Sequence, residues 1–232
     1  MRVNIAIVGD ENHAYPSHRE INAVRSMLGE DVETQWVATD GDRVRDLGGF
    51  DGVWLTPGSP YVNDAAAYEA VTWARECDVP FLGTCGGLQY AVIEYFRNVL
   101  GLASASHAEA DGIDDTNVVR ALACSLNGEE RVVRPIAGTR FSRLVNDQAF
   151  VGMHYCNYGP GAEEVRRLVE NGMVVEATAD DAGAEVIELP TNRFFMLSLF
   201  QPQIGALAGK AVHRLLGEFV RCAREHAAGG VD

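Results

Sequence analysis

The sequence has few basic residues and no long apolar run. Its 19 lysines and arginines stand against 33 aspartates and glutamates, so the formal net charge is −14. Binding to nucleic-acid phosphates needs a basic surface, and this charge therefore argues against a nucleic-acid partner. No apolar run reaches the roughly 18 residues of a membrane span, and the first residues do not resemble a signal peptide. We expect a cytoplasmic protein that does not bind a membrane.

Paired cysteines and glycine-rich nucleotide motifs are also missing. The five cysteines are widely spaced and include no Cys-x-x-Cys pair, so neither a disulfide framework nor a zinc site is expected. Neither a Gly-x-Gly-x-x-Gly fingerprint nor a Walker motif occurs. The acidic stretch with Asp111, Asp114 and Asp115 lacks the spacing of a calcium loop, and a solvated loop explains it better. The sequence predicts no cofactor and no metal.

What the first half does contain is an alternation of strands and helices. Runs rich in β-branched residues predict buried strands at residues 3–8, 32–37, 52–55 and 79–83. Helical spacing of apolar residues predicts helices at residues 16–28, from 63 or 64 onward and at 87–100. Ser17 is the expected N-cap of the first helix. This order predicts an α/β fold with a mostly parallel sheet covered on both faces.

The second half changes this rhythm. It predicts further strands with fewer helices between them, at residues 130–136, 173–177, 185–189 and 194–199. We expect these strands to form an antiparallel or mixed extension of the sheet. An apolar stripe predicts a last helix at residues 204–226 that packs back on the sheet. With 47% hydrophobic residues, the length suits a single domain over residues 1–232.

The segment from Gly83 to Gly87, Gly-Thr-Cys-Gly-Gly, lies between a predicted buried strand and a helix start. A tight strand-to-helix turn needs small residues around a nucleophile. The N-terminus of the helix stabilises a thiolate and offers N–H groups to an oxyanion. Cys85 is therefore the predicted nucleophile. The alternative is a small, inert, buried cysteine at a tight turn.

The elbow carries a resemblance to a known family. The run from Pro80 to Gln89, Pro-Phe-Leu-Gly-Thr-Cys-Gly-Gly-Leu-Gln, resembles the class I glutamine amidotransferase domain of CTP synthase and the CTP synthase C-terminal region-related proteins. Weaker similarity is found at Thr56-Pro57-Gly58, Ala108-Glu109 and Ile187-Glu188-Leu189-Pro190. The resemblance implies a flavodoxin-like sheet with an antiparallel extension. We expect the chain to be a stand-alone version of this domain.

The chain departs from the family where the general base should be. In the family a His-Pro-Glu segment serves the cysteine, but the matching positions here are Gln201-Pro202-Gln203. An amide cannot accept a thiol proton at neutral pH, so Gln201 cannot act as the general base. These two positions are a degraded triad.

Other site residues follow from the resemblance. It implies an oxyanion hole formed by the N–H of Gly86 with another from Gly58 or Ser59. It implies that Gln89 and Glu109 bind substrate, with Glu109 pairing with an α-amino group. The position of the family's arginine for the α-carboxylate falls on His154. Tyr155 is also expected to contact substrate.

Residues 153–158 are predicted to be extended, which places His154 and Cys156 on one face. We expect that face to look toward Cys85. Either His154 replaces the lost base, or Cys156 acts as a second thiol and substrate contact, or His154 is a hydrogen-bonded structural histidine. His13 and His18 follow the first strand, and solvated loop positions are expected for both.

The sequence thus predicts a cysteine-dependent enzyme acting on a small amide, nitrile or amino-acid-like carbonyl substrate. Two alternatives stay open: a glutaminase subunit that supplies ammonia to a partner synthetase, and a non-catalytic protein that binds a small molecule in the retained pocket. A homodimer is expected by analogy with related folds.

Overall fold

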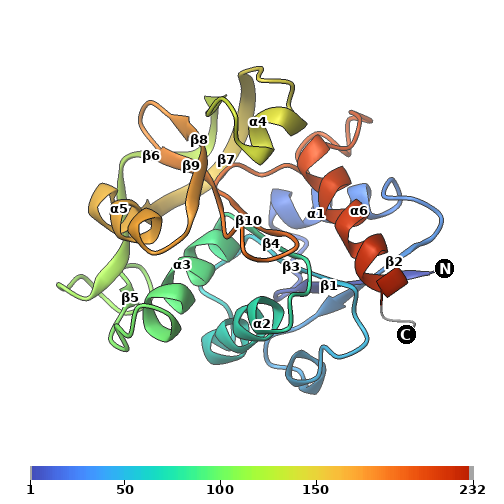
Figure 1. The fold of residues 1–232 in the computed structure, drawn as a ribbon, viewed down its shortest axis with the longest axis horizontal. Helices are drawn as coiled ribbons and strands as arrows, with labels where there is room; N and C mark the ends of the chain where they lie inside the picture. Colours follow the sequence, from blue (N-terminus) through green and yellow to red (C-terminus); the bar gives the residue numbers. More distant parts are fainter. Residues whose placement is uncertain (1, 230–232) are drawn as a thin grey trace.

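The computed structural model describes residues 2–229 and forms one layered α/β unit (Figure 1). Within this range, ten strands form a sheet in the order β2-β1-β3-β4-β10-β9-β8-β6-β5, with β7 paired to β6. The first five of these in spatial order are parallel, namely β2 (Val32–Val37), β1 (Val3–Val8), β3 (Gly52–Leu55), β4 (Phe81–Thr84) and β10 (Phe195–Ser198). The predicted parallel core of the fold is confirmed.

The rest of the sheet is mainly antiparallel. Strand β9 (Gly183–Glu188) pairs antiparallel with β10 and with β8 (Val174–Ala179). The outer part is a long hairpin of β6 (Asn117–Pro135) and β7 (Phe150–Pro160), with the short β5 (Ser106–His107) at its edge. The predicted strands at 130–136 and 153–158 are fragments of this hairpin, which also places β7 beside the end of β10.

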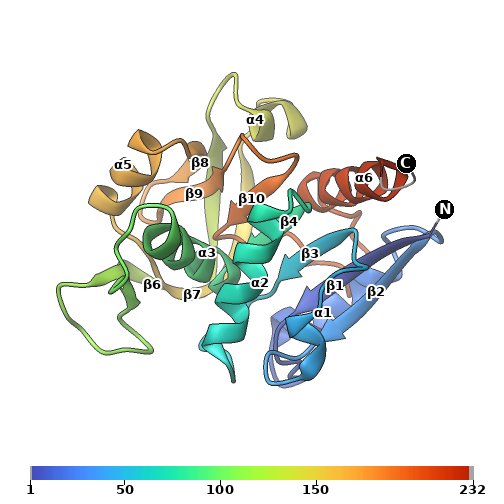
Figure 2. The ribbon, with the colours of Figure 1, turned by 60° about the horizontal axis from the view of Figure 1, so that its bottom comes forward.

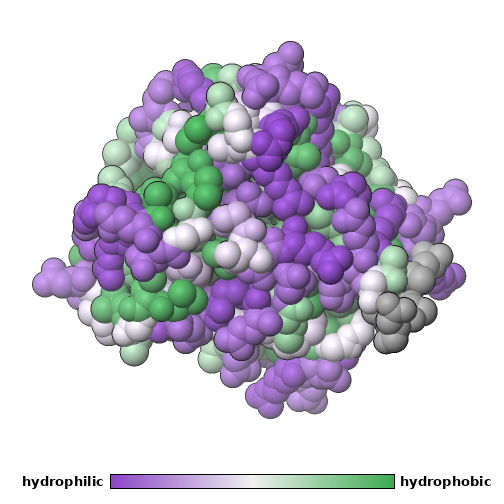
Figure 3. All heavy atoms as spheres, in the orientation of Figure 1, coloured by the Kyte–Doolittle hydropathy of each residue, from purple (hydrophilic) through white to green (hydrophobic). Residues whose placement is uncertain are grey.

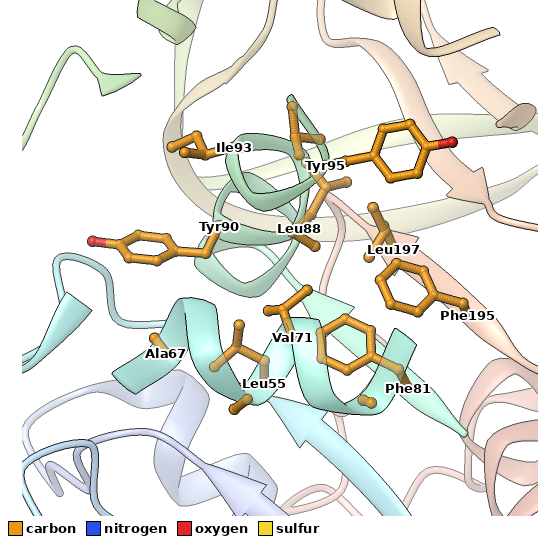
Figure 4. Packing of buried hydrophobic residues seen from close by; sticks show 14 of the residues in the cluster. Leu55, Ala67, Val71, Phe81, Leu88, Tyr90, Ile93, Tyr95, Phe195 and Leu197 are labelled. Atoms are coloured by element: carbon orange, nitrogen blue, oxygen red, sulfur yellow. The ribbon is translucent and has the colours of Figure 1, made fainter. Parts of the chain in front are cut away.

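Helices cover both faces of the sheet, as Figures 1 and 2 show. On one face lie α2 (Asp64–Glu76) and α3 (Gly86–Asn98), whose apolar residues pack against β3 and β4. Figure 4 shows this packing, with Leu88 of α3 and Val71 of α2 near Phe81. On the other face lie α1 (Pro16–Arg25) and α6 (Arg214–Gly229). The remaining short elements are a 3-10 turn at Asp42–Arg45, α4 (Arg140–Leu144) and α5 (Ala162–Glu170).

Two predictions about helix starts are wrong. The last helix begins at Arg214 instead of residue 204, and Leu207, placed on its apolar stripe, is 63% exposed. Gly205 and Gly209 have φ values of 105° and 72°, and this backbone forms turns where a helix would need negative φ. At the first helix, Tyr15 is the N-cap and Ser17 lies buried in the first turn. Pro16, with its fixed φ, starts that helix.

The face shown in Figure 3 is mostly hydrophilic, with apolar side chains in small groups. No helix among residues 2–229 is both long enough and apolar enough to cross a membrane.

Candidate active site

Cys85 occupies the tight turn between β4 and α3. Its backbone has φ 51° and ψ −107°, and it is the N-cap residue of α3. A positive φ is costly for a residue with a side chain, so the surrounding structure must hold it. The Cys85 N–H donates to the carbonyl of Ser198 at the end of β10, at 2.8 Å, and the Cys85 carbonyl accepts from Gln89 N–H at 3.2 Å. The turn is the predicted nucleophile elbow in its geometry.

Two glycines make this turn possible. A Cβ added at Gly87 would lie 2.1 Å from the carbonyl oxygen of Leu55, and one at Gly86 would lie 2.6 Å from Ser59 Oγ. Both distances are far below van der Waals contact, so any side chain would force the β3 end or the loop after it to move. The sequence therefore brings the start of α3 directly against the loop with Gly58 and Ser59.

This loop presents backbone N–H groups beside the elbow. The backbone nitrogen of Ser59 lies 3.0 Å from the position that a Cβ on Gly86 would take. The N–H of Gly86 opens α3, so it has no acceptor within the helix. Two backbone nitrogens from separate segments thus lie close together next to Cys85, and an oxyanion hole is built from N–H groups placed in this way.

His18 forms a hydrogen bond to the loop that carries Gly58 and Ser59. The prediction of a solvated loop position is wrong, because His18 lies in α1 with 1% of its surface exposed. Its Nδ1 accepts from the N–H of Asn12 at 2.9 Å, so Nε2 carries the hydrogen and donates to the carbonyl of Pro57 at 2.8 Å. Burial lowers the pKa of His18 and keeps this pattern in place. His13 has an exposed side chain, as expected.

Gln89 is buried and all its polar atoms are engaged. Its Oε1 accepts from Ser59 Oγ at 3.1 Å and from His107 Nε2 at 3.0 Å, and its Nε2 donates to the carbonyl of Tyr158 at 2.8 Å. His107 Nδ1 in turn accepts from the N–H of Glu109 at 3.1 Å. Gln89 lines the cavity beside Cys85, and its hydrogen bonds connect the segments that carry Ser59, His107 and Tyr158.

The second cysteine lies against the first. Cys156 on β7 and Cys85 are 4% and 5% exposed, and both line the same cavity. The hydrogen bond to Cys85 raises the pKa of Cys156 well above that of a free thiol, and burial and the charge of Glu185 act in the same direction. Cys156 therefore keeps its proton and donates a hydrogen bond to the sulfur of Cys85.

The degraded triad positions form a buried amide pair. Gln203 Nε2 donates to Gln201 Oε1 at 3.0 Å, while Gln201 Nε2 has no partner among the described residues. Gln201 lines the cavity. Its unpaired amide nitrogen is buried, so position 201 offers no proton acceptor of the histidine type to Cys85.

His154 lies behind the cavity. It is fully buried on β7, and its Nε2 contacts both carboxylate oxygens of Glu185 on β9, at 2.9 and 3.0 Å. Phe200 N–H also donates to Glu185, at 3.2 Å. His154 Nδ1 has no partner within residues 2–229. The expected face toward Cys85 is occupied by Cys156 alone, since His154 does not line the cavity.

The cavity next to Cys85 has a volume of about 230 Å³. Tyr155, Tyr158, Asn127 and Asn157 from the β6–β7 hairpin form one wall, and the segments at 15–17 and 57–59 form the other. Glu109 is its only lining residue with a formal charge within the described chain, and burial raises the pKa of this carboxyl. No group of three or more metal-ligating side chains was found in the described part of the chain.

The structure therefore brings most of the predicted site residues together around one cavity, and Gly86, His154 and Gln203 do not line it. Sequence reasoning missed the bracing role of His107 and the buried carboxylate of Glu185. Both come from segments far from the elbow along the chain, and no motif links them to it. Strand alternation in β9 gave no reason to single out Glu185 from its neighbours.

Comparisons with known proteins agree with this geometry. The sequence model of the family "Glutamine amidotransferase class-I" matches residues 17–149. CTP synthase of Natronomonas pharaonis is 32% identical over 93% of this chain and 42% of the relative. CTP synthase of Methanopyrus kandleri is 32% identical over 89% and 42%. The chain thus spans about two fifths of the length of these relatives.

Solved structures show the same fold. The glutaminase domain of Trypanosoma brucei CTPS with bound acivicin has a TM-score of 0.82 at 21% identity, covering 96% of this chain and 94% of that one. A glutamine amidotransferase from Thermotoga maritima has a TM-score of 0.61 at 14% identity, covering 100% and 87%. These likenesses place the antiparallel extension within a known architecture.

Proposed function

The chain belongs to the class I glutamine amidotransferase family, and we propose that it is a Cys85-dependent enzyme that releases ammonia from a small amide or acts on a related nitrile or carbonyl. The observation that carries this proposal is the elbow. A strained Cys85 faces a cavity with the N–H groups of Gly86 and Ser59 beside it.

The reaction on an amide has two stages. The Cys85 thiolate forms a bond to the carbonyl carbon, and the N–H groups of Gly86 and Ser59 stabilise the oxyanion. The C–N bond then breaks, and the nitrogen takes up a proton and leaves as ammonia. Water cleaves the thioester, which gives a carboxylic acid and the free thiol of Cys85. Tyr155 lines the cavity and contacts the substrate chain.

The thiol proton of Cys85 must be transferred without a histidine at position 201. Cys156 donates a hydrogen bond to the sulfur of Cys85, and in this proposal that hydrogen bond takes the place of a base in contact with the nucleophile. His154 and Glu185 form a fully buried pair on the neighbouring strands. In this proposal His154 is a positioning residue that holds the Glu185 carboxylate behind Cys156.

The pH dependence of alkylation tests the role of His154. Replacement by Gln keeps a hydrogen bond to Glu185 but removes the imidazole ring. We expect His154→Gln to slow iodoacetamide labelling of Cys85 near neutral pH and to change its pH profile, whereas the labelling of exposed Cys124 stays the same. An unchanged profile would leave His154 a purely structural histidine.

Acyl-enzyme trapping tests the proposed chemistry. The chain is incubated with a panel of small amides and nitriles, quenched with acid and analysed by mass spectrometry. We expect a covalent adduct that maps to Cys85 and that is absent in Cys85→Ala. If no compound forms an adduct or releases ammonia, the site is a binding pocket without catalysis.

A second function is favoured by the relatives. They are CTP synthases, and this chain covers 42% of their length, so it could act as a glutaminase subunit that feeds ammonia to a synthetase partner. Ammonia release from glutamine, measured for the chain alone and with the uncovered part of the Methanopyrus kandleri protein, separates the two. A rise of tenfold or more with that partner would favour the subunit.

A further inference from the structure

The cavity next to Cys85 has an unusual balance of charge. Glu109 lies at its rim, and no Lys, Arg or His side chain from the described residues lines it. The other polar groups of the lining, from Ser17, Ser59, Asn127, Asn157 and the tyrosines, are neutral. A free amino acid brings both an ammonium and a carboxylate into such a site. Only the ammonium meets an opposite charge here.

Glu109 is free to receive a cation. Its carboxylate has no hydrogen bond or ion pair with any described side chain, while its backbone N–H is held by His107 at 3.1 Å. The backbone is therefore fixed and the carboxylate is available. Burial raises the pKa of Glu109, because the ionised form is partly desolvated, and a bound ammonium would reverse this shift.

A carboxylate finds no comparable partner. His154, at the position that corresponds to the family's carboxylate-binding arginine, is sealed behind the cavity and paired with Glu185. The N-terminus of α3 and the Ser59 N–H lie at Cys85, where they serve the reacting carbonyl. A second anion would lie near the carboxylate of Glu109 without a counter-charge, which is unfavourable.

We propose that the enzyme acts on primary amides that carry an ammonium group and no free carboxylate, with Glu109 selecting the ammonium. This proposal rests on the proposed function and narrows its substrate class. Such a substrate can be a simple amino amide, or a residue whose carboxyl group is already engaged in an ester or amide bond. Free glutamine is disfavoured by its α-carboxylate.

Four matched compounds test the charge selection. 4-Aminobutanamide is glutamine without its carboxylate, 4-carbamoylbutanoate is glutamine without its amino group, butanamide lacks both, and L-glutamine has both. Ammonia release gives kcat/KM for each compound. Protection of Cys85 from iodoacetamide gives its binding without any need for turnover. We expect both measures to rank 4-aminobutanamide first and 4-carbamoylbutanoate last, with about tenfold or more between 4-aminobutanamide and glutamine.

A variant pair links the ranking to Glu109. Glu109→Gln should reduce 4-aminobutanamide to the level that butanamide has in the same variant, and an unchanged urea unfolding midpoint would show that the fold is intact. Glu69→Gln, on the exposed face of α2, makes the same charge change away from the site. It should preserve the ranking.

The outcomes separate this inference from the proposed function. If protection follows the expected ranking but no compound releases ammonia, the charge selection stands and the enzymatic function fails. If glutamine is turned over or bound as well as 4-aminobutanamide, the function stands and the charge selection is overturned. It is also overturned if none of the compounds protects Cys85, or if Glu109→Gln leaves the ranking unchanged.

Discussion

The two sides of the cavity next to Cys85 differ in how tightly their residues are packed and in which catalytic groups they carry. On the nucleophile side, the elbow, Gly86, Gly87 and the Ser59 loop meet at distances that allow no side chain to be added. On the opposite side, Gln201 and Gln203 form a buried amide pair just after β10, at the positions where the resemblance implies a His and a Glu.

This difference has a physical origin. The nucleophile side depends on backbone conformation and on N–H groups, so a change there disrupts packing as well as chemistry. The base side depends on side chains that point into a cavity, and an imidazole can be replaced by an amide of similar size. A fold can therefore retain a strained nucleophile while its proton acceptor changes.

The largest effect is expected on the backbone of the nucleophile side. Gly87→Ala would drive a methyl group to 2.1 Å from the carbonyl of Leu55. We expect a loss of more than about 3 kcal/mol in the free energy of unfolding, measured in urea. Gly217→Ala in α6, where an added Cβ meets nothing within 4 Å, should instead stabilise the protein by about 0.5–1 kcal/mol. An effect of Gly87→Ala as small as that of Gly217→Ala would contradict the dependence of the nucleophile side on its backbone packing.

Rebuilding the base side should give the next largest effect. The double substitution Gln201→His with Gln203→Glu restores an acceptor and its orienting carboxylate beside Cys85. We expect amide turnover to rise by about 100-fold, the contribution typical of a positioned general base. Gln203→Glu alone serves as the control and should not raise turnover. No increase in the double variant would mean that the proton already has an efficient acceptor.

Low pH should weaken the hydrogen bond between His107 and Gln89. Burial lowers the pKa of His107 to about 4, although the charge of Asp111 opposes this shift. The neutral imidazole is favoured in the folded state, so its contribution to stability is complete above the unfolded-state pKa near 6.5 and is lost as pH falls toward 4.

The measurement is urea unfolding at pH 7.5 and pH 5.0. From the two pKa values, His107 accounts for a loss of about 2 kcal/mol over this range. The loss should be smaller by that amount in His107→Gln and unchanged in His13→Gln, whose side chain is exposed in the native protein. The same pH dependence in all three proteins would exclude His107 as the source.

The smallest effect concerns the second thiol. Cys156→Ala removes the donor to the sulfur of Cys85, whereas Cys156→Ser keeps an O–H in its place. A hydrogen bond to a charged group is worth about 1.5 kcal/mol or more, so labelling of Cys85 at pH 7 should slow by about tenfold in the alanine variant. The serine variant should stay within about threefold of the wild type. Equal labelling rates of Cys85 in the two variants would mean that a hydrogen bond from position 156 does not affect its reactivity.

Much of the fold could be predicted from the sequence, because its first half follows simple patterns. β-branched runs and helical spacing gave the parallel strands and α2 with its Asn63 cap. The patterns failed where glycines interrupt an apolar stripe, as at Gly205 and Gly209. The long β6–β7 hairpin was found only in fragments, because β6 is largely exposed and its outer residues carry little apolar signal.

The site divides in the same way. Cys85 and its small neighbours are contiguous in sequence, so local pattern was enough to find the elbow. His107 and Glu185 act through contacts with residues 18 and 31 positions away, and only the folded chain brings them together. His154 was predicted from the resemblance, which gives it a pocket position, and from alternation along one strand, which gives its face but not its pairing with Glu185.

The most direct test of the central claim compares Cys85 with the exposed thiol of Cys124 in one molecule. The two iodoacetamide labelling rates are followed by peptide mass spectrometry between pH 5.5 and 9. A stabilised thiolate predicts that Cys85 reacts faster than Cys124 at low pH and that their rate ratio falls as pH rises. A constant ratio, with Cys85 the slower thiol throughout, would mean that the elbow is retained as structure without an activated nucleophile.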